Sequence, residues 1–244
     1  MIMQKSLEKY LAIVIFLVLG LSNALLFTNE ISYSLHDCNG IPLDQKLVEI
    51  LDYSNGIFIE AGAHDGITQS NTKLLEEVYG WSGILIEPSE IVFSSLYANR
   101  PHSKCFHCAL GSFEQNNTLV EGDFDGGLMS SVNAIRTHRN TKQTVLMRSL
   151  QSILDETNIQ HINFFSLDTE GYELNILLGI DFSKTKFDYI LVEIYAHQYD
   201  EIKTFLAENG YDLIENFTNY NQLDNPIWDG THNDYLFKRN TLRD

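Results

Sequence analysis

Phe58-Ile59-Glu60-Ala61-Gly62-Ala63-His64-Asp65-Gly66 is the stretch that predicts the fold. An apolar run ends in an acid, a loop of small residues follows, and a helix-like segment extends over residues 68–77, which together indicate a buried strand, a tight turn and a helix. Gly62 and Gly66 carry no Cβ atom, so the backbone of this turn can approach a ligand closely. In an open parallel sheet such a turn lies at the carboxyl edge, where ligands bind. His64 stands where the dinucleotide fingerprint has a glycine, so the turn favours a smaller nucleoside.

Outward from this stretch, expected strands and helices alternate along the chain. Before the middle of the chain they are a helix at 43–53, a strand at 56–60, a helix at 71–78, a strand at 83–87, a helix at 91–99 and a strand at 104–109. After a polar, glycine-rich insertion at 112–144, which we interpret as partly a hairpin, they are a helix at 145–157, a strand at 162–168, a helix at 170–178, a strand at 189–193, a helix at 200–209 and strands at 211–215 and 235–238. This order predicts a doubly wound, mainly parallel, Rossmann-like α/β sheet whose last two strands form an antiparallel pair at one side.

Four short motifs follow one another along the chain. They are Glu60-Ala-Gly-Ala-His-Asp-Gly66, Ser70-Asn71-Thr72 with Leu75-Glu76, Gly83-Ile-Leu-Ile-Glu87-Pro88-Ser89 and Phe165-Ser-Leu-Asp168-Thr-Glu170-Gly171-Tyr-Glu173-Leu. The first resembles the first motif of methyltransferases that use S-adenosylmethionine (SAM), and the ordered set resembles the FkbM-type methyltransferases over about residues 47–238. The resemblance implies a SAM-dependent enzyme, and this family is associated with O-methylation of sugars and small metabolites.

Four expected strands end in an acid: Glu60, Glu87, Asp168 and Glu193. A carboxylate at the end of a buried strand is costly without a partner, and SAM offers a sulfonium, an ammonium and two ribose hydroxyls. We expect Glu87, at the second strand end, to accept both ribose hydroxyls, Glu60 to line the methionine end and Asp168 to lie near the methyl donor. For Glu193 a helix-end acid favoured by the helix dipole is the preferred interpretation.

The resemblance extends to a set of predicted site residues. The cofactor would contact Glu60, Gly62, Ala63, Asp65, Gly66, Asn71, Glu87, Pro88, Ala109, Leu110 and Asp168. Methyl transfer needs the acceptor, methyl group and sulfur aligned, and a proton removed from the acceptor. The candidate bases are Asp168, Glu170 and His64, although His64 stands where the family commonly has an asparagine, and a helix-end role explains Glu170 equally well. No metal site is predicted.

The N-terminus and the net charge bear on location and partners. The formal net charge of −17 disfavours a nucleic-acid-binding surface. A glycan or small-molecule acceptor is what the family resemblance implies. The apolar run at 11–21 follows Lys5 and Lys9 and precedes Ser22-Asn23-Ala24, which predicts a signal anchor spanning 11–27 or a signal peptide cleaved after Ala24. We therefore divide the chain into an anchor or signal peptide (1–28), a linker (29–42) and a methyltransferase-like domain (43–244) that is lumenal or extracellular, or secreted.

Two other functions compete with methylation. Asp123-Phe124-Asp125 matches the D-x-D motif of lumenal glycosyltransferases, which holds a metal and a nucleotide sugar, but it lies in a glycine-rich insertion and not after a nucleotide-binding half. It does not fit an EF-hand, because no glutamate follows at the required distance. An FkbM-like domain behind a membrane anchor also resembles the Star-type trafficking proteins of the secretory pathway. The intact acids and Gly62 favour the enzyme.

Overall fold

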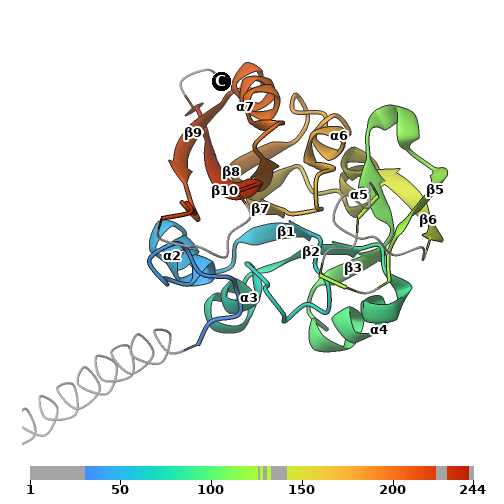
Figure 1. Cartoon of the computed structure of the whole chain (residues 1–244). Helices are drawn as coiled ribbons and strands as arrows, with labels where there is room; N and C mark the ends of the chain where they lie inside the picture. The colour runs from blue at the N-terminus through green and yellow to red at the C-terminus, as the bar shows by residue number, and fades with distance from the viewer. Residues whose placement is uncertain (1–30, 126, 129–130, 133–141, 224–229, 242–244) are drawn as a thin grey trace, which may run out of the picture. The chain divides into compact units, whose positions relative to one another are not determined.

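A sheet of seven strands forms the centre of the structure, a computed structural model that describes residues 31–125, 127–128, 131–132, 142–223 and 230–241. In the order β3-β2-β1-β7-β8-β10-β9 the strands lie side by side (Figure 1). They are β1 (Ile57–Ala61), β2 (Ser82–Glu87), β3 (Lys104–His107), β7 (His161–Leu167), β8 (Lys186–Tyr195), β9 (Tyr211–Asn216) and β10 (His232–Arg239). The first five in this order are parallel, and β10 is antiparallel to both β8 and β9. The predicted mainly parallel sheet with an antiparallel final pair is confirmed.

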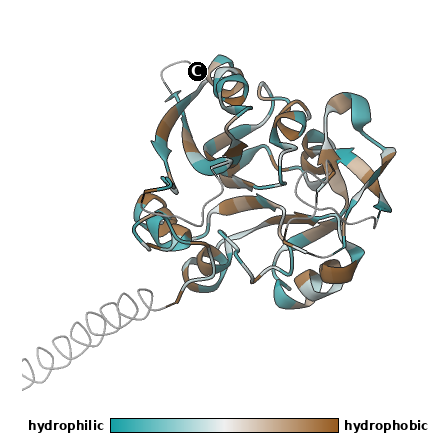
Figure 2. Ribbon diagram, in the orientation of Figure 1, coloured by the Kyte–Doolittle hydropathy of each residue, from teal (hydrophilic) through white to brown (hydrophobic). Residues whose placement is uncertain are grey.

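Six helices cover the two faces of this sheet in the described part of the chain. On one face lie α2 (Leu43–Ile50), α3 (Lys73–Tyr79) and α4 (Glu90–Asn99), and on the other α5 (Leu150–Thr157), α6 (Glu173–Leu177) and α7 (Tyr199–Glu208). Successive side chains of a strand point to opposite faces, so Phe58 packs in the core under α2 and α3 whereas Ile59 packs under α5 to α7. The strands between the helix layers are mostly hydrophobic (Figure 2). The fold is doubly wound.

A second, smaller sheet contains β4 (Ala109–Gly111), β6 (Lys142–Ser149) and β5 (Thr118–Asp123), in that order. It corrects two predictions. The strand expected at 104–109 is interrupted at Cys108, because the chain leaves β2 there and pairs with β6. The helix expected at 145–157 begins only at Leu150, because Val145, Met147 and Ser149 are buried alternately, as in a strand, and the Ser149 side chain then caps α5 by accepting from Ser152 N.

Two other helices begin later than their patterns predict. After β1, the backbone at Gln69 is left-handed (φ 58°), and α3 starts only at Lys73. After β7, Glu170 (φ 59°) and Gly171 (φ 95°) are both left-handed, and α6 starts only at Glu173. Left-handed residues cannot continue a right-handed helix. The chain therefore forms an irregular loop at the end of β1 and another at the end of β7.

The residues before α2 are tied to the folded unit, which begins at Tyr33. Ser34 Oγ donates to Asp44 Oδ1, and the backbone N–H of Cys38 donates to the carbonyl of Thr218 at 2.8 Å. Most of the region expected to be a linker is thus held by hydrogen bonds. The predicted span at 11–27 lies outside the described residues. Among those that are described, none of the helices has the length and apolar character needed to cross a bilayer.

Candidate active site

A pocket lies at the carboxyl ends of β1, β2 and β7. At this point the strand order reverses, since the chain continues from β1 to β2 and β3 on one side and from β7 to β8 on the other. Crevices of this kind are where open α/β sheets bind ligands. The predicted site residues that line the pocket are Gly62, His64, Glu87, Pro88, Ala109, Leu110, Asp168 and Glu170.

Gly62 brings the β1 loop against the end of β7. Its φ is +85°, and a Cβ atom added there would lie 1.8 Å from the carbonyl oxygen of Asp168. The N–H of Gly62 donates to the carbonyl of Ile86 on β2 at 3.1 Å. Any side chain at this position would push the loop and β7 apart, so only glycine fits. Gly66 (φ +78°) is equally restricted, but a Cβ there would meet Arg100 and Leu96, so Gly66 packs on α4 and does not line the pocket.

Glu87 is held in place by the backbone on both sides of the pocket. Oε2 accepts from the N–H of His64 at 2.9 Å, and Oε1 accepts from the N–H of Ser89 at 2.8 Å. Burial raises the pKa of this carboxyl, and the two backbone hydrogen bonds act in the opposite direction. Each carboxylate oxygen can accept more than one hydrogen bond, so both retain acceptor capacity. The result is a fixed, buried acceptor pair at the second strand end.

Glu60 is hydrogen-bonded by the segment that follows the β1 loop, and its contact with the cofactor, directly or through water, stays a prediction. Its carboxylate accepts from Ser70 Oγ at 2.9 Å, Thr72 Oγ1 at 2.6 Å and the N–H of Asn71 at 2.8 Å. Arg100, which is fully buried, lies 3.7 Å from it. The Ser-Asn-Thr motif therefore closes on the strand-end acid beneath the loop. Glu60 is not among the described residues that line the pocket.

Three other predicted contacts shape the loop without lining the pocket. Asp65 accepts from the N–H groups of Ile67 and Thr68. Burial acts to raise the pKa of this carboxyl, but those hydrogen bonds outweigh it and lower the pKa. Asn71 donates from Nδ2 to Ser166 Oγ, and Ala63 is buried in the core under α2 and α3. Their cofactor contacts stay predictions.

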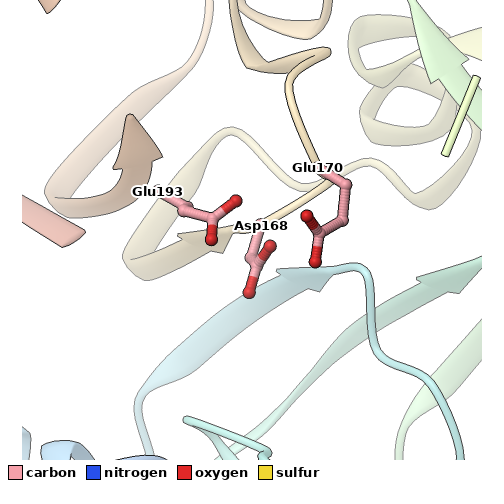
Figure 3. Close-up of side chains that lie close together, drawn as sticks. All are labelled: Asp168, Glu170 and Glu193. Atoms are coloured by element: carbon pink, nitrogen blue, oxygen red, sulfur yellow. The ribbon is translucent and has the colours of Figure 1, made fainter. Parts of the chain in front are cut away.

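Three carboxylates gather beside the pocket at the ends of β7 and β8. Asp168, Glu170 and Glu193 each place a carboxylate oxygen within 4.8 Å of the others, and their side chains converge in Figure 3. Tyr195 Oη donates to Glu170 Oε2 at 2.7 Å, and His232 Nε2 lies 3.3 Å from Glu193 Oε1. Burial, and next the neighbouring carboxylates, hold the pKa values of Asp168 and Glu193 well above the usual range.

Part of the pocket wall comes from the insertion, which contributes residues that the sequence motifs do not mark. Phe124, between the two aspartates of the D-x-D motif, is buried and lines the pocket. Asp123 ends β5 and exchanges two backbone hydrogen bonds with Ser131, and Asp125 Oδ1 accepts from the N–H of Gly127. Leu128 and Val132 of the insertion also line the pocket, together with Thr68, Gln69, Ile86, Cys108 and Tyr172 from elsewhere in the chain. For the lining residues that come from the insertion, the only sequence signal is the length of the excursion, which is typical of functional insertions.

Residues 60–213 match the family described as Methyltransferase FkbM domain. The chain belongs to this family. The match covers more than half of the chain and runs from β1 to β9. No curated protein matches the chain.

Solved structures of methyltransferases are similar to this FkbM domain at low identity. A putative RNA methyltransferase from Pyrococcus horikoshii is similar over 82% of this chain and 80% of its own, at 12% identity and a TM-score of 0.44. A precorrin-6y C5,15-methyltransferase from Geobacter metallireducens aligns over 80% and 88%, at 8% identity and a TM-score of 0.45. Fibrillarin from Aeropyrum pernix, solved with natively bound S-adenosyl-L-methionine, aligns over 76% and 67%, at 10% identity and a TM-score of 0.42.

Proposed function

We propose that this FkbM domain binds SAM in the pocket at the ends of β1, β2 and β7 and methylates an oxygen of a sugar or small-molecule acceptor. The observation that supports this most is the fixed, buried carboxylate of Glu87 at the pocket wall. The SAM-binding part of the proposal also follows from membership of a methyltransferase family.

The residues present fit the chemical groups of SAM. A vicinal diol is recognised well by one carboxylate that is already oriented and can accept two further hydrogen bonds. Glu87 meets both conditions, because backbone N–H groups hold each of its oxygens. Leu110 and Phe124, both buried, offer an apolar surface in the same pocket for a nucleobase. Gly62 lets the backbone reach the ligand without a side chain intervening.

Bound SAM would supply an already activated methyl group, so the chain has only to position the acceptor and remove its proton. Asp168 and Glu170 line the same pocket and are the groups that we expect to face the acceptor. Their carboxylates favour an acceptor with hydroxyl groups, which donate hydrogen bonds to them. His64, which also lines the pocket, is the remaining candidate base.

The competing functions receive less support. Among the described residues that line the pocket is Phe124 of the D-x-D motif, but neither of its aspartates. That arrangement disfavours a nucleotide sugar held by a metal on Asp123 and Asp125. A non-catalytic role like that of Star-type proteins leaves no need for a pocket with an oriented Glu87.

Calorimetry of the full-length protein tests the proposal. We expect both SAM and S-adenosylhomocysteine to bind with one site per chain. A parallel titration uses a UDP-sugar with Mn²⁺, and here we expect no binding. If neither SAM nor its product binds, the enzymatic proposal is wrong and the non-catalytic function is favoured. If the UDP-sugar alone binds, the glycosyltransferase interpretation replaces it.

We further propose that residues 11–27 hold the protein in a membrane with the FkbM domain on the lumenal or extracellular side. The support is the apolar run after Lys5 and Lys9. Protease treatment of sealed microsomes carrying the full-length protein checks this topology. Protection of the domain is expected, and digestion of the domain without detergent would contradict it.

A further inference from the structure

We propose that Asp168, Glu170 and Glu193 form a binding site for one hard divalent cation, such as Mg²⁺ or Mn²⁺, beside the pocket. The three side chains come from three places in the chain. Asp168 follows β7, Glu170 lies in the loop before α6, and Glu193 lies on β8 next to β7. Figure 3 shows the three carboxylates directed toward a common point.

The spacing of the carboxylates suits one ion. One oxygen from each carboxylate lies within 4.8 Å of the other two. Ligand oxygens bound to one ion at about 2.1–2.4 Å lie roughly 3 to 4.8 Å apart, depending on whether they are adjacent or opposite. A set made only of carboxylate oxygens favours magnesium, manganese or calcium over zinc or copper.

A second observation concerns Glu193 alone. Its side chain is only 7% exposed, and its Oε1 faces His232. Its Oε2 is buried and has no hydrogen-bond partner among the residues that the structure describes. A buried carboxylate oxygen without a donor is costly, and the carboxylate is directed toward Asp168, another acceptor (Figure 3). A cation between them would provide the partner that this oxygen lacks.

Neighbouring side chains hold the proposed metal-binding carboxylates in position, as in known metal sites. Tyr195 Oη donates to Glu170 Oε2, which fixes that carboxylate. His232 Nε2 lies 3.3 Å from Glu193 Oε1 and helps to fix the second carboxylate. Such outer contacts commonly fix the carboxylates that bind a metal.

The position of the site suggests what the cation does. Asp168 and Glu170 also line the pocket, so a cation on them would be accessible to an acceptor hydroxyl. Coordination to a divalent cation orients a hydroxyl and lowers its pKa. This consequence rests on the proposed methylation, whereas binding of the cation does not. It implies an acceptor with an alcohol or phenol oxygen, since these coordinate magnesium and manganese.

The test is a titration of the full-length protein with Mn²⁺, followed by electron paramagnetic resonance of the free ion, without SAM. We expect one site per chain, and displacement of Mn²⁺ by excess Mg²⁺. Glu193→Gln keeps the shape of the side chain and removes its charge, so it should weaken binding at least tenfold. Glu121→Gln removes one acid from an exposed position on β5 and should change the affinity less than twofold.

Two outcomes overturn the inference: wild type that binds no Mn²⁺, or Glu193→Gln that binds as well as wild type. Glu170→Gln is the second variant, and it decides the question if Glu193→Gln does not fold. A SAM titration in EDTA separates the two proposals. SAM binding without Mn²⁺ binding contradicts only the cation site, and Mn²⁺ binding without SAM binding contradicts only the proposed cofactor.

Discussion

Two groups of acids lie at neighbouring strand ends, and they differ in what surrounds them. Glu60, on β1, receives hydrogen bonds from Ser70, Asn71 and Thr72 and lies 3.7 Å from the guanidinium of Arg100. The Asp168–Glu170–Glu193 cluster instead places carboxylates against one another. The two groups give the same signal in the sequence, an acid at the end of an apolar run.

The difference teaches how to separate structural acids from ligand-binding ones. A buried carboxylate that accepts three hydrogen bonds beside a buried guanidinium, as Glu60 does, stabilises the fold and has little capacity for a ligand, whereas Glu87 accepts only one on each oxygen. A buried carboxylate that faces other carboxylates is unfavourable without an added proton or cation. The first kind holds the β1 loop in shape, and the second kind is available for chemistry.

The largest effect is expected from Arg100→Met. Arg100 is fully buried, and its Nε donates to Glu76 at 2.7 Å while Glu60 lies nearby. Removing it leaves two buried carboxylates without their cation, which should lower the free energy of unfolding by about 3–5 kcal/mol. Urea denaturation measures this value. Arg148→Met is the matched control, because the partner of Arg148 is Glu156, which is 57% exposed, and the loss should be under about 1 kcal/mol. Equal losses in the two variants would mean that the Glu60 group is not stabilised as described.

The next effect concerns SAM binding by Glu87→Ala. If the carboxylate accepts both ribose hydroxyls, its loss leaves two donors without partners, at about 1–3 kcal/mol each. The affinity for SAM should fall roughly a hundredfold or more, as measured by calorimetry. Because Glu87 also accepts from the N–H groups of His64 and Ser89, the alanine variant loosens the loops around it.

Glu87→Gln provides the control for that loosening. It keeps one acceptor oxygen and the size of the side chain, so it should melt close to wild type and still bind SAM more weakly. An unchanged affinity in both variants would reduce Glu87 to a strand-end acid that shapes the loop.

A smaller effect is expected from removing the proposed cation. At Mn²⁺ concentrations ten times the dissociation constant, binding should stabilise wild type by about 1.4 kcal/mol relative to EDTA. Glu193→Gln should lose most of this difference, because it removes one ligand and one of the repelling charges. Thermal melts in Mn²⁺ and in EDTA measure both values. A cation effect of the same size in both proteins would place the bound ion elsewhere.

The smallest effect tests a fully matched acid far from both groups. The side chain of Asp37 is only 5% exposed. Burial acts to raise the pKa of its carboxyl, but the N–H groups of Ile41 and Asn39 and the ammonium of Lys46 outweigh burial. The net result is a lowered pKa. A carboxyl whose pKa is lower in the folded state than in the unfolded state stabilises the folded protein at pH values above the unfolded pKa. This stabilisation is lost as the pH falls through the folded pKa. Asp37→Asn should therefore cost about 0.5–1 kcal/mol at pH 7 and almost nothing below about pH 3. Urea denaturation across this range checks it, and a constant difference would contradict the role of the charge.

Much of the fold could be predicted because apolar runs and turn residues alternate regularly. The strand that replaces the expected helix at Val145–Ser149 could not, because alternating burial depends on the neighbouring strand β5. Glu60 was placed at the pocket because it ends an apolar run, as Glu87 does. Its side chain instead points to the same face of the sheet as Phe58. This face is covered by α3 and α4, and Arg100 lies there. A partner 40 residues away along the sequence leaves no local signal.

The acidic cluster shows the same limit more clearly. Asp168 and Glu193 were both recognised as strand-end acids, but no motif joins them and no metal site was expected. Their proximity depends on β8 lying next to β7, which is a property of the strand order. Glu170 joins them because the left-handed backbone at Glu170 and Gly171 delays α6. Sequence patterns give each residue's element, whereas a site made by three elements needs their arrangement.

The close approach of Gly62 to Asp168 has a thermodynamic consequence. Asp168 directs its carbonyl to the glycine loop and its carboxylate to the acidic cluster, so one residue belongs to both proposed sites. A ligand that shifts the loop must also shift a cation ligand. If both ligands bind, the factor by which Mn²⁺ changes the affinity for SAM equals the factor by which SAM changes the affinity for Mn²⁺. Titrating each ligand with and without the other measures that coupling, and a factor of one would mean that the contact through Asp168 transmits nothing.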